Sequence, residues 1–207
     1  MPTDPYIGHC FVGRRFLNGH RIYRVLGTYV PGSTAQPVYR CETLSYKGDN
    51  TVSVEYDYID VTMAGDFLIQ EITTEQYMRG IDLFYQSLVQ IRHFITSMKS
   101  TACDHIEIGK AYSLFDVLYY DIRLLPQDKF LECKLMNVKP TSISLNNSWV
   151  PPSLSLSNRI DYEEIDVIDA QKAVKQFQLL YATVRSYINA LVKEDPAYPH
   201  FQINSNK

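Results

Sequence analysis

Arginine is concentrated in one stretch of this chain, "RRFLNGHRIYRV" at residues 14–25. Apolar residues and an Asn-Gly turn dipeptide separate its four arginines, which are Arg14, Arg15, Arg21 and Arg24. A planar guanidinium makes paired contacts with phosphate or carboxylate and stacks on aromatic rings. The stretch therefore predicts either a ligand surface for such groups or arginines held in the fold by neighbouring carboxylates.

Groups that carry out catalysis or bind metals do not fall at recognisable spacings. The five histidines and four cysteines form no CxxC or HExxH pattern, and no GxSxG, P-loop or GxGxxG motif is present. We therefore predict no catalytic residue, no metal site and no cofactor. Binding is favoured over catalysis, and an enzyme whose site matches no known motif is the third alternative.

The charge of the chain changes sign along its first third. Residues 1–48 carry a net charge of +4, and residues 49–73 carry −6 with no lysine or arginine. In one interpretation the arginine strands lie beside the acidic strand and the charges pair across a sheet. In the other, the arginines stay free on one face and bind a phosphate backbone or an acidic peptide. Both interpretations remain open from the sequence.

Composition places the chain among globular proteins. Of its 207 residues, 45% are hydrophobic and 21% are charged, and the net charge is −3. The chain also has 16 tyrosines, a residue that favours half-buried surfaces and contact patches. Neither a signal peptide nor a membrane-spanning run is recognisable, and the cysteines are scattered. We therefore expect an intracellular protein, cytoplasmic or nuclear, that is neither secreted nor transmembrane.

Short strands separated by turn residues are predicted up to residue 72. "CFVGRRFL" ends at Asn-Gly, "HRIYRVLGTYV" at Pro-Gly and "PVYRCETLSY" at Gly-Asp-Asn, and "TVSVEYDYIDV" alternates apolar and polar residues. Together they resemble the strand pattern of SH3-like and Tudor-like small barrels, over residues 8–72. The resemblance implies a five-stranded β-barrel at residues 6–72. In Tudor-like modules it also implies an aromatic cage for methylated Lys or Arg, and the tyrosines available for one are Tyr23, Tyr29, Tyr39, Tyr56 and Tyr58.

A helical region is predicted at residues 73–195, followed by a tail at 196–207. Thr73 and Gln76 fit a capping box, and apolar residues then repeat in a heptad pattern over 74–99 and again over 166–193. A shorter helix is expected around residues 115–125, a weak strand at "FLECKLMNV", and a long irregular connection at 140–158. The predicted fold class is thus α+β, an N-terminal SH3-like barrel followed by two long antiparallel heptad-patterned helices.

Two binding functions follow from these patterns. The first is a non-enzymatic binding or assembly protein, whose barrel recognises a protein or nucleic-acid partner and whose helices, 74–99 and 166–193, mediate self-association or docking. The second is a nucleic-acid-binding component of a nucleoprotein complex, through the arginine face. The predicted partner-binding residues are Arg14, Arg15, Arg21, Tyr23, Tyr29, Tyr39, Tyr56 and Tyr58.

Strand alternation separates the arginines of the opening stretch. Arg21 falls on the face of Tyr23 and Val25, whereas Arg24 falls on the opposite face. A barrel has a single outer face, so one of the two must be accommodated inside. We expect Arg24 to be the structural arginine, paired with a carboxylate of residues 55–60, and Arg14, Arg15 and Arg21 to face solvent.

Overall fold

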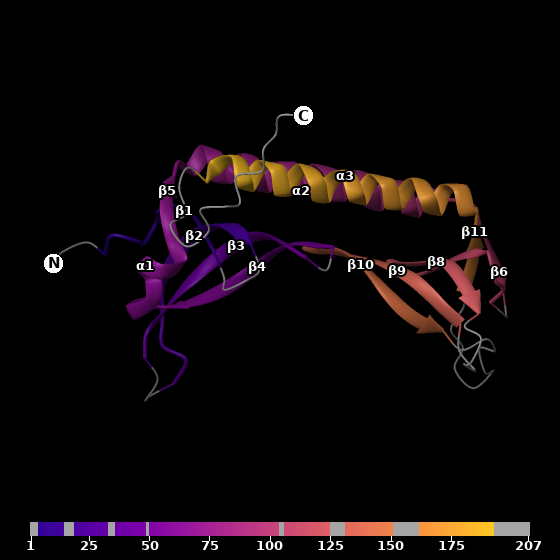
Figure 1. Cartoon of the computed structure of the whole chain (residues 1–207), viewed down its shortest axis with the longest axis horizontal. Helices are drawn as coiled ribbons and strands as arrows, with labels where there is room; N and C mark the ends of the chain where they lie inside the picture. Colours follow the sequence, from indigo (N-terminus) through magenta and orange to yellow (C-terminus); the bar gives the residue numbers. More distant parts are fainter. Residues whose placement is uncertain are drawn as a thin grey trace. The chain divides into compact units, whose positions relative to one another are not determined.

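The strands pair into an open antiparallel sheet and not into a small barrel. The computed structural model describes residues 4–14, 19–32, 36–48, 50–103, 106–124, 131–150 and 162–192. Eleven strands lie in this part of the chain, in the order β5-β1-β2-β3-β4-β10-β9-β8-β7-β11-β6 (Figure 1). Both ends of the order are edge strands, so the sheet is not closed. The predicted SH3-like barrel followed by two long antiparallel helices is therefore wrong.

Two of the three helices that the structure describes correspond to the heptad-patterned segments of the sequence, 74–99 and 166–193. The described chain contains α1 (Ala64–Phe67), α2 (Thr74–Thr96) and α3 (Val167–Leu191), with a 3-10 turn η1 at Val61–Met63. Helix α2 begins at the predicted capping box, because Gln76 N–H donates to the Thr73 hydroxyl (3.1 Å) and Thr73 N–H donates to the Gln76 side chain (2.9 Å). That prediction is confirmed.

Contacts divide the chain into two compact units. Unit 1 comprises residues 1–46, 54–81 and 184–207, and unit 2 comprises residues 47–53 and 82–183. Most of unit 2 falls in the predicted helical region, but the described residues between 100 and 165 form six strands, of which β9 (Leu131–Lys139) corresponds to the weak strand expected at "FLECKLMNV". The described part of the expected helix at 115–125 is mostly strand β8 (Val117–Leu124), and much of the expected irregular connection at 140–158 is strand β10. Residues 151–161 and the predicted tail at 196–207 lie outside the described chain.

Unit 1 is built from the strands that the sequence predicted. They are β1 (Cys10–Arg14), β2 (His20–Tyr29), β3 (Val38–Lys47), the larger part of β4 (Thr51–Asp60), and β5 (Leu68–Ile72). One face of these strands carries an apolar cluster that contains Phe11, Tyr23, Tyr39 and Leu68. On the other face Gly80 of α2 lies against Ile22 and Leu44, so the helix covers this face.

Unit 2 contains the remaining strands. They are β6 (Ser100–Cys103), β7 (Ala111–Leu114), β8 (Val117–Leu124), β9 (Leu131–Lys139), β10 (Ser142–Val150) and β11 (Tyr162–Ile165). The first residues of β4, Thr51 to Ser53, pair with β10 in the same unit. An apolar cluster that includes Tyr112, Ile122 and Tyr162 forms part of the core.

The first prediction concerns the close approach between β1 and the end of α1. A Cβ atom at Gly13 would lie 2.0 Å from the Phe67 carbonyl oxygen, a backbone atom that cannot turn aside. We expect Gly13→Ala to destabilise the protein by about 3 kcal/mol, at the upper end of overpacking costs, as measured by urea denaturation. Gly27→Ala is the matched control, because a Cβ at Gly27 meets nothing within 4 Å. Equal stability of the two variants would contradict the packing of β1 against α1.

Candidate functional site

Three tyrosines and one arginine form an exposed cluster on unit 1. Tyr29, Tyr56 and Tyr58 are 51%, 53% and 54% exposed. The ring centroids of Tyr29 and Tyr58 are 5.9 Å apart, and the guanidinium carbon of Arg40 lies 4.1 Å from the centroid of the Tyr56 ring. We call Tyr29, Arg40, Tyr56 and Tyr58 the tyrosine surface.

A β-bulge places Tyr29 on this surface. Before the bulge, buried Tyr23 pairs with Thr43 of β3. The register shifts between Val25 and Gly27, after which Tyr29 pairs with Val38. Because one extra residue reverses the alternation of side chains, Tyr29 leaves the face of Tyr23 and joins the face of Arg40.

The other described tyrosines of the predicted cage are part of the core. Tyr23 is 1% exposed and Tyr39 is 2% exposed. The Tyr39 hydroxyl donates to both carboxylate oxygens of Asp4, at 2.8 and 3.0 Å, and the Tyr23 hydroxyl donates to the Arg14 carbonyl at 3.3 Å. Burial is the main cause that raises the pKa of Tyr39 to about 12, and the Asp4 carboxylate adds to it. Of the five tyrosines available for a cage, Tyr23 and Tyr39 are therefore core residues and not partner-binding ones, whereas Tyr29, Tyr56 and Tyr58 lie on the surface.

Arg21 is the structural arginine, and the expectation that it faces solvent is wrong. Its side chain is 1% exposed and lies 3.2 Å from the Asp57 carboxylate, which is 8% exposed, and 3.8 Å from that of Glu55. A carboxylate of the acidic strand β4 therefore does pair with an arginine, as the structural interpretation held, but the arginine is Arg21 of β2, and β3 lies between the two strands. Arg14 is partly buried, and Arg15 lies outside the described residues.

Arg24 lies on the opposite face from Arg21, against α2. In the strand register it is opposite Glu42, whose carboxylate accepts a hydrogen bond from the Tyr77 hydroxyl at 2.9 Å. Its predicted pairing with a carboxylate of residues 55–60 is therefore wrong. Alternation correctly separated Arg21 from Arg24, but it does not tell which face of the sheet a helix covers.

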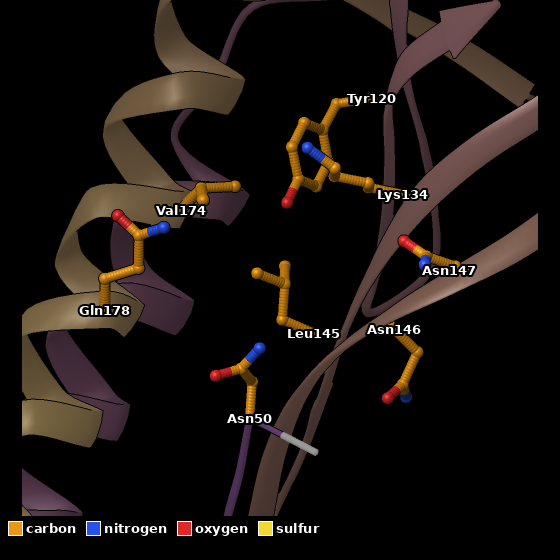
Figure 2. A pocket seen from close by; sticks show the side chains of 8 residues that line it. All are labelled: Asn50, Tyr120, Lys134, Leu145, Asn146, Asn147, Val174 and Gln178. Atoms are coloured by element: carbon orange, nitrogen blue, oxygen red, sulfur yellow. The ribbon is translucent and has the colours of Figure 1, made fainter. Parts of the chain in front are cut away.

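Unit 2 contains a pocket of about 280 Å³ between α3 and the sheet (Figure 2). Val174 and Gln178 of α3 line one side, and Tyr120, Lys134 and Leu145 extend toward them from three neighbouring strands. The remaining lining residues are Asn50, Asn146 and Asn147. Neither this pocket nor the role of Arg40 was predicted. The pocket joins residues that are distant in sequence, whereas the i, i+2 spacing of Tyr56 and Tyr58 was visible in the chain.

No family model, no curated protein and no solved structure matches this chain. Nowhere in the described chain do three or more His, Cys, Asp or Glu side chains gather in a way that could hold a metal ion. Among the helices that the structure describes, none combines the length and the apolar character needed to cross a bilayer. The candidate sites of this chain are therefore the tyrosine surface and the pocket of unit 2.

The buried ion pair gives the second prediction. Replacing Arg21 by Met removes the guanidinium that faces Asp57 and leaves a buried carboxylate without it. We expect Arg21→Met to lower the free energy of unfolding by about 3–5 kcal/mol, and Arg21→Met/Asp57→Leu to recover part of that loss. Chemical denaturation of both variants measures this.

Arg40→Met is the matched control for the second prediction, because it removes the same group from the exposed surface. Its expected cost is about 1 kcal/mol or less, which corresponds to an exposed cation–π contact. If Arg21→Met cost no more than Arg40→Met, the pair between Arg21 and Asp57 would not stabilise unit 1.

Proposed function

We propose that this protein is a non-enzymatic binding protein that contacts a protein partner through the tyrosine surface. One observation supports the proposal above all others, namely that three half-exposed tyrosines and an arginine gather on a single sheet face. Tyrosine and arginine are enriched in protein interfaces and among the residues that contribute most to binding energy. The rigid ring of tyrosine covers a large area at little cost in conformational entropy.

Two exposed apolar residues lie in or beside β2, the strand that carries Tyr29. Leu26 and Val30 are 43% and 54% exposed. Single exposed apolar residues are common on proteins, so the proposal rests on the three tyrosines and Arg40. The bulge after Val25 supports the proposal, because bulges commonly re-aim side chains at functional positions.

The composition of the tyrosine surface favours a protein over a nucleic acid. Its one arginine, Arg40, already stacks on Tyr56, and Arg21 is paired inside the fold. Asp60 follows Tyr58 by two residues on β4. A phosphate backbone requires several free cations, so the alternative of nucleic-acid binding loses most of its support.

The heptad pattern predicted apolar helix faces that could bind another chain, but most of these faces are buried. Eleven of the fourteen heptad residues are at most 9% exposed, namely Tyr77, Ile81, Phe84, Leu88, Ile91, Ile95, Ala170, Val174, Phe177, Val184 and Ile188, whereas Met98, Tyr181 and Leu191 are partly exposed. Because most of these side chains are buried in the chain's own fold, we place the partner on the tyrosine surface. Self-association or docking through the exposed sides of the helices is the competing proposal.

The cellular location that we propose is intracellular. All four cysteines are free thiols, and Cys10, Cys41 and Cys133 are buried. Burial raises the pKa of Cys41 to about 12 and that of Cys133 to about 11, so these two thiols stay protonated and unreactive at neutral pH. Unpaired cysteines are typical of proteins in a reducing compartment.

A photo-crosslinking experiment tests the proposed function and forms the third prediction. We expect a photoreactive phenylalanine at position 58, introduced into the full chain in its own cells, to capture one defined protein. The same probe at Leu179 of α3, which is 69% exposed, is the matched control for helix docking. Capture from position 179 and not from 58 would contradict the proposal.

The captured protein, once purified, then allows a quantitative test. We expect Tyr58→Ser to weaken its affinity at least about tenfold, as at a residue central to an interface. The same substitution should cost less than about 1.5 kcal/mol of stability, because what it removes inside the chain is one exposed aromatic contact. Unchanged affinity would place the partner elsewhere.

A further inference from the structure

A row of polar side chains crosses three strands of unit 2 on the face that α3 covers. In the strand register Tyr120 of β8 is opposite Lys134 of β9, and Lys134 is opposite Asn147 of β10. Lateral neighbours in a sheet point to the same side. A phenol, an ammonium and an amide are therefore held side by side at the pocket, and this row is independent of the tyrosine surface.

Next to this polar row the same sheet face is apolar. The neighbouring side chains on this face, two positions away along each strand, are those of Leu118, Met136 and Leu145. Leu118 and Met136 are 0% exposed. Polar groups on a covered face need hydrogen-bond partners. At the polar row the sheet and α3 leave a space of about 280 Å³ between them instead of packing together.

The Tyr120 hydroxyl points into this space (Figure 2). The residue is 8% exposed, and its hydroxyl has no hydrogen-bond partner within the described part of the chain. Burial raises the pKa of Tyr120 to about 12, and the neighbouring Asp121 adds to the shift. The group is thus a neutral donor at physiological pH, aimed at whatever occupies the pocket.

Lys134 supplies the positive charge of the pocket. Its ammonium lies 2.8 Å from Asp121, which has a positive φ of 53° in the bulge between Tyr120 and Arg123. The two side chains are 44% and 46% exposed. An ion pair this exposed contributes little net free energy, so Lys134 can exchange Asp121 for a better acceptor at small cost.

No carboxylate lines the pocket. Beyond Lys134 and Tyr120, its polar groups are the side-chain amides of Asn50, Asn146, Asn147 and Gln178, and its apolar walls are Leu145 and Val174. One cation among neutral polar groups fits a negatively charged oxygen group, which would take the place of Asp121 beside Lys134. We propose that unit 2 binds a small molecule whose carboxylate or phosphate group is held by Lys134, Tyr120 and a side-chain amide, with an apolar part against Leu145 and Val174.

An NMR titration of the full chain tests this proposal. Sodium phosphate and sodium acetate are added separately as probes, with sodium chloride at equal ionic strength as the reference. We expect the amide signals of residues 145–147 to shift saturably with phosphate, with acetate or with both, and a dissociation constant on the order of 1 mM or weaker for such small probes. A response to one probe alone assigns the group as phosphate or carboxylate, and shifts no larger than those with chloride would overturn the proposal.

Two variants of the pocket and one control variant make the test specific to the pocket. Lys134→Gln should weaken the probe at least about tenfold, whereas Lys139→Gln, which removes the same charge from the exposed end of β9, should not. Tyr120→Phe should weaken it several-fold while the remaining spectrum is preserved, because the lost hydroxyl has no partner in the described chain. Equal weakening by Lys134→Gln and Lys139→Gln would show general charge attraction and would overturn the site.

Discussion

The fold depends on the covering of its antiparallel sheet by the two helices of the same chain. A sheet with an apolar face is stable only when another layer packs against it. In unit 1 the fit is tight, because a Cβ at Gly80 of α2 would lie 2.7 Å from Ile22, 3.0 Å from Tyr187 and 3.3 Å from Leu44. Polar contacts hold the same layer, since the Tyr187 hydroxyl donates to the Gln76 carbonyl at 2.5 Å. Most heptad residues of both helices are buried in this packing.

The tyrosine surface and the pocket of unit 2 lie where the helices do not pack directly against the sheet. On unit 1, strands β2 to β4 present Tyr29, Arg40 and Tyr56 to solvent on the face where Ile22 and Leu44 are covered by α2. In unit 2, the pocket opens where Tyr120 and Lys134 replace the apolar residues of the covered face. A β-bulge adjoins each site, after Val25 in β2 and after Tyr120 in β8. The first changes the direction of Tyr29, and the second contains Asp121, the ion-pair partner of Lys134.

Local patterns predicted the parts of this structure that depend on neighbouring residues. The strands of unit 1 and the start of α2 were found because turn dipeptides and a capping box act within a few residues. Apolar residues at 115, 118, 122 and 125 predict a helix, although Leu118, Tyr120 and Ile122 are all buried in strand β8. The sequence predicts an irregular connection at 140–158, because serine and asparagine obscure the alternation of Ile143 and Leu145 in β10. The open sheet itself depends on the pairing of β4 with β10, which lie about ninety residues apart and leave no local signal.

Most heptad residues of α2 and α3 are buried within the chain's own fold and not by a second chain. Hydrogen–deuterium exchange at two widely separated protein concentrations measures this most directly. The structure predicts slow exchange across Thr74–Thr96 and Val167–Leu191 that does not change with concentration, because the covering layer is intramolecular. Protection of these helices that disappears on dilution would contradict it, since the seams would then be covered by another copy of the chain.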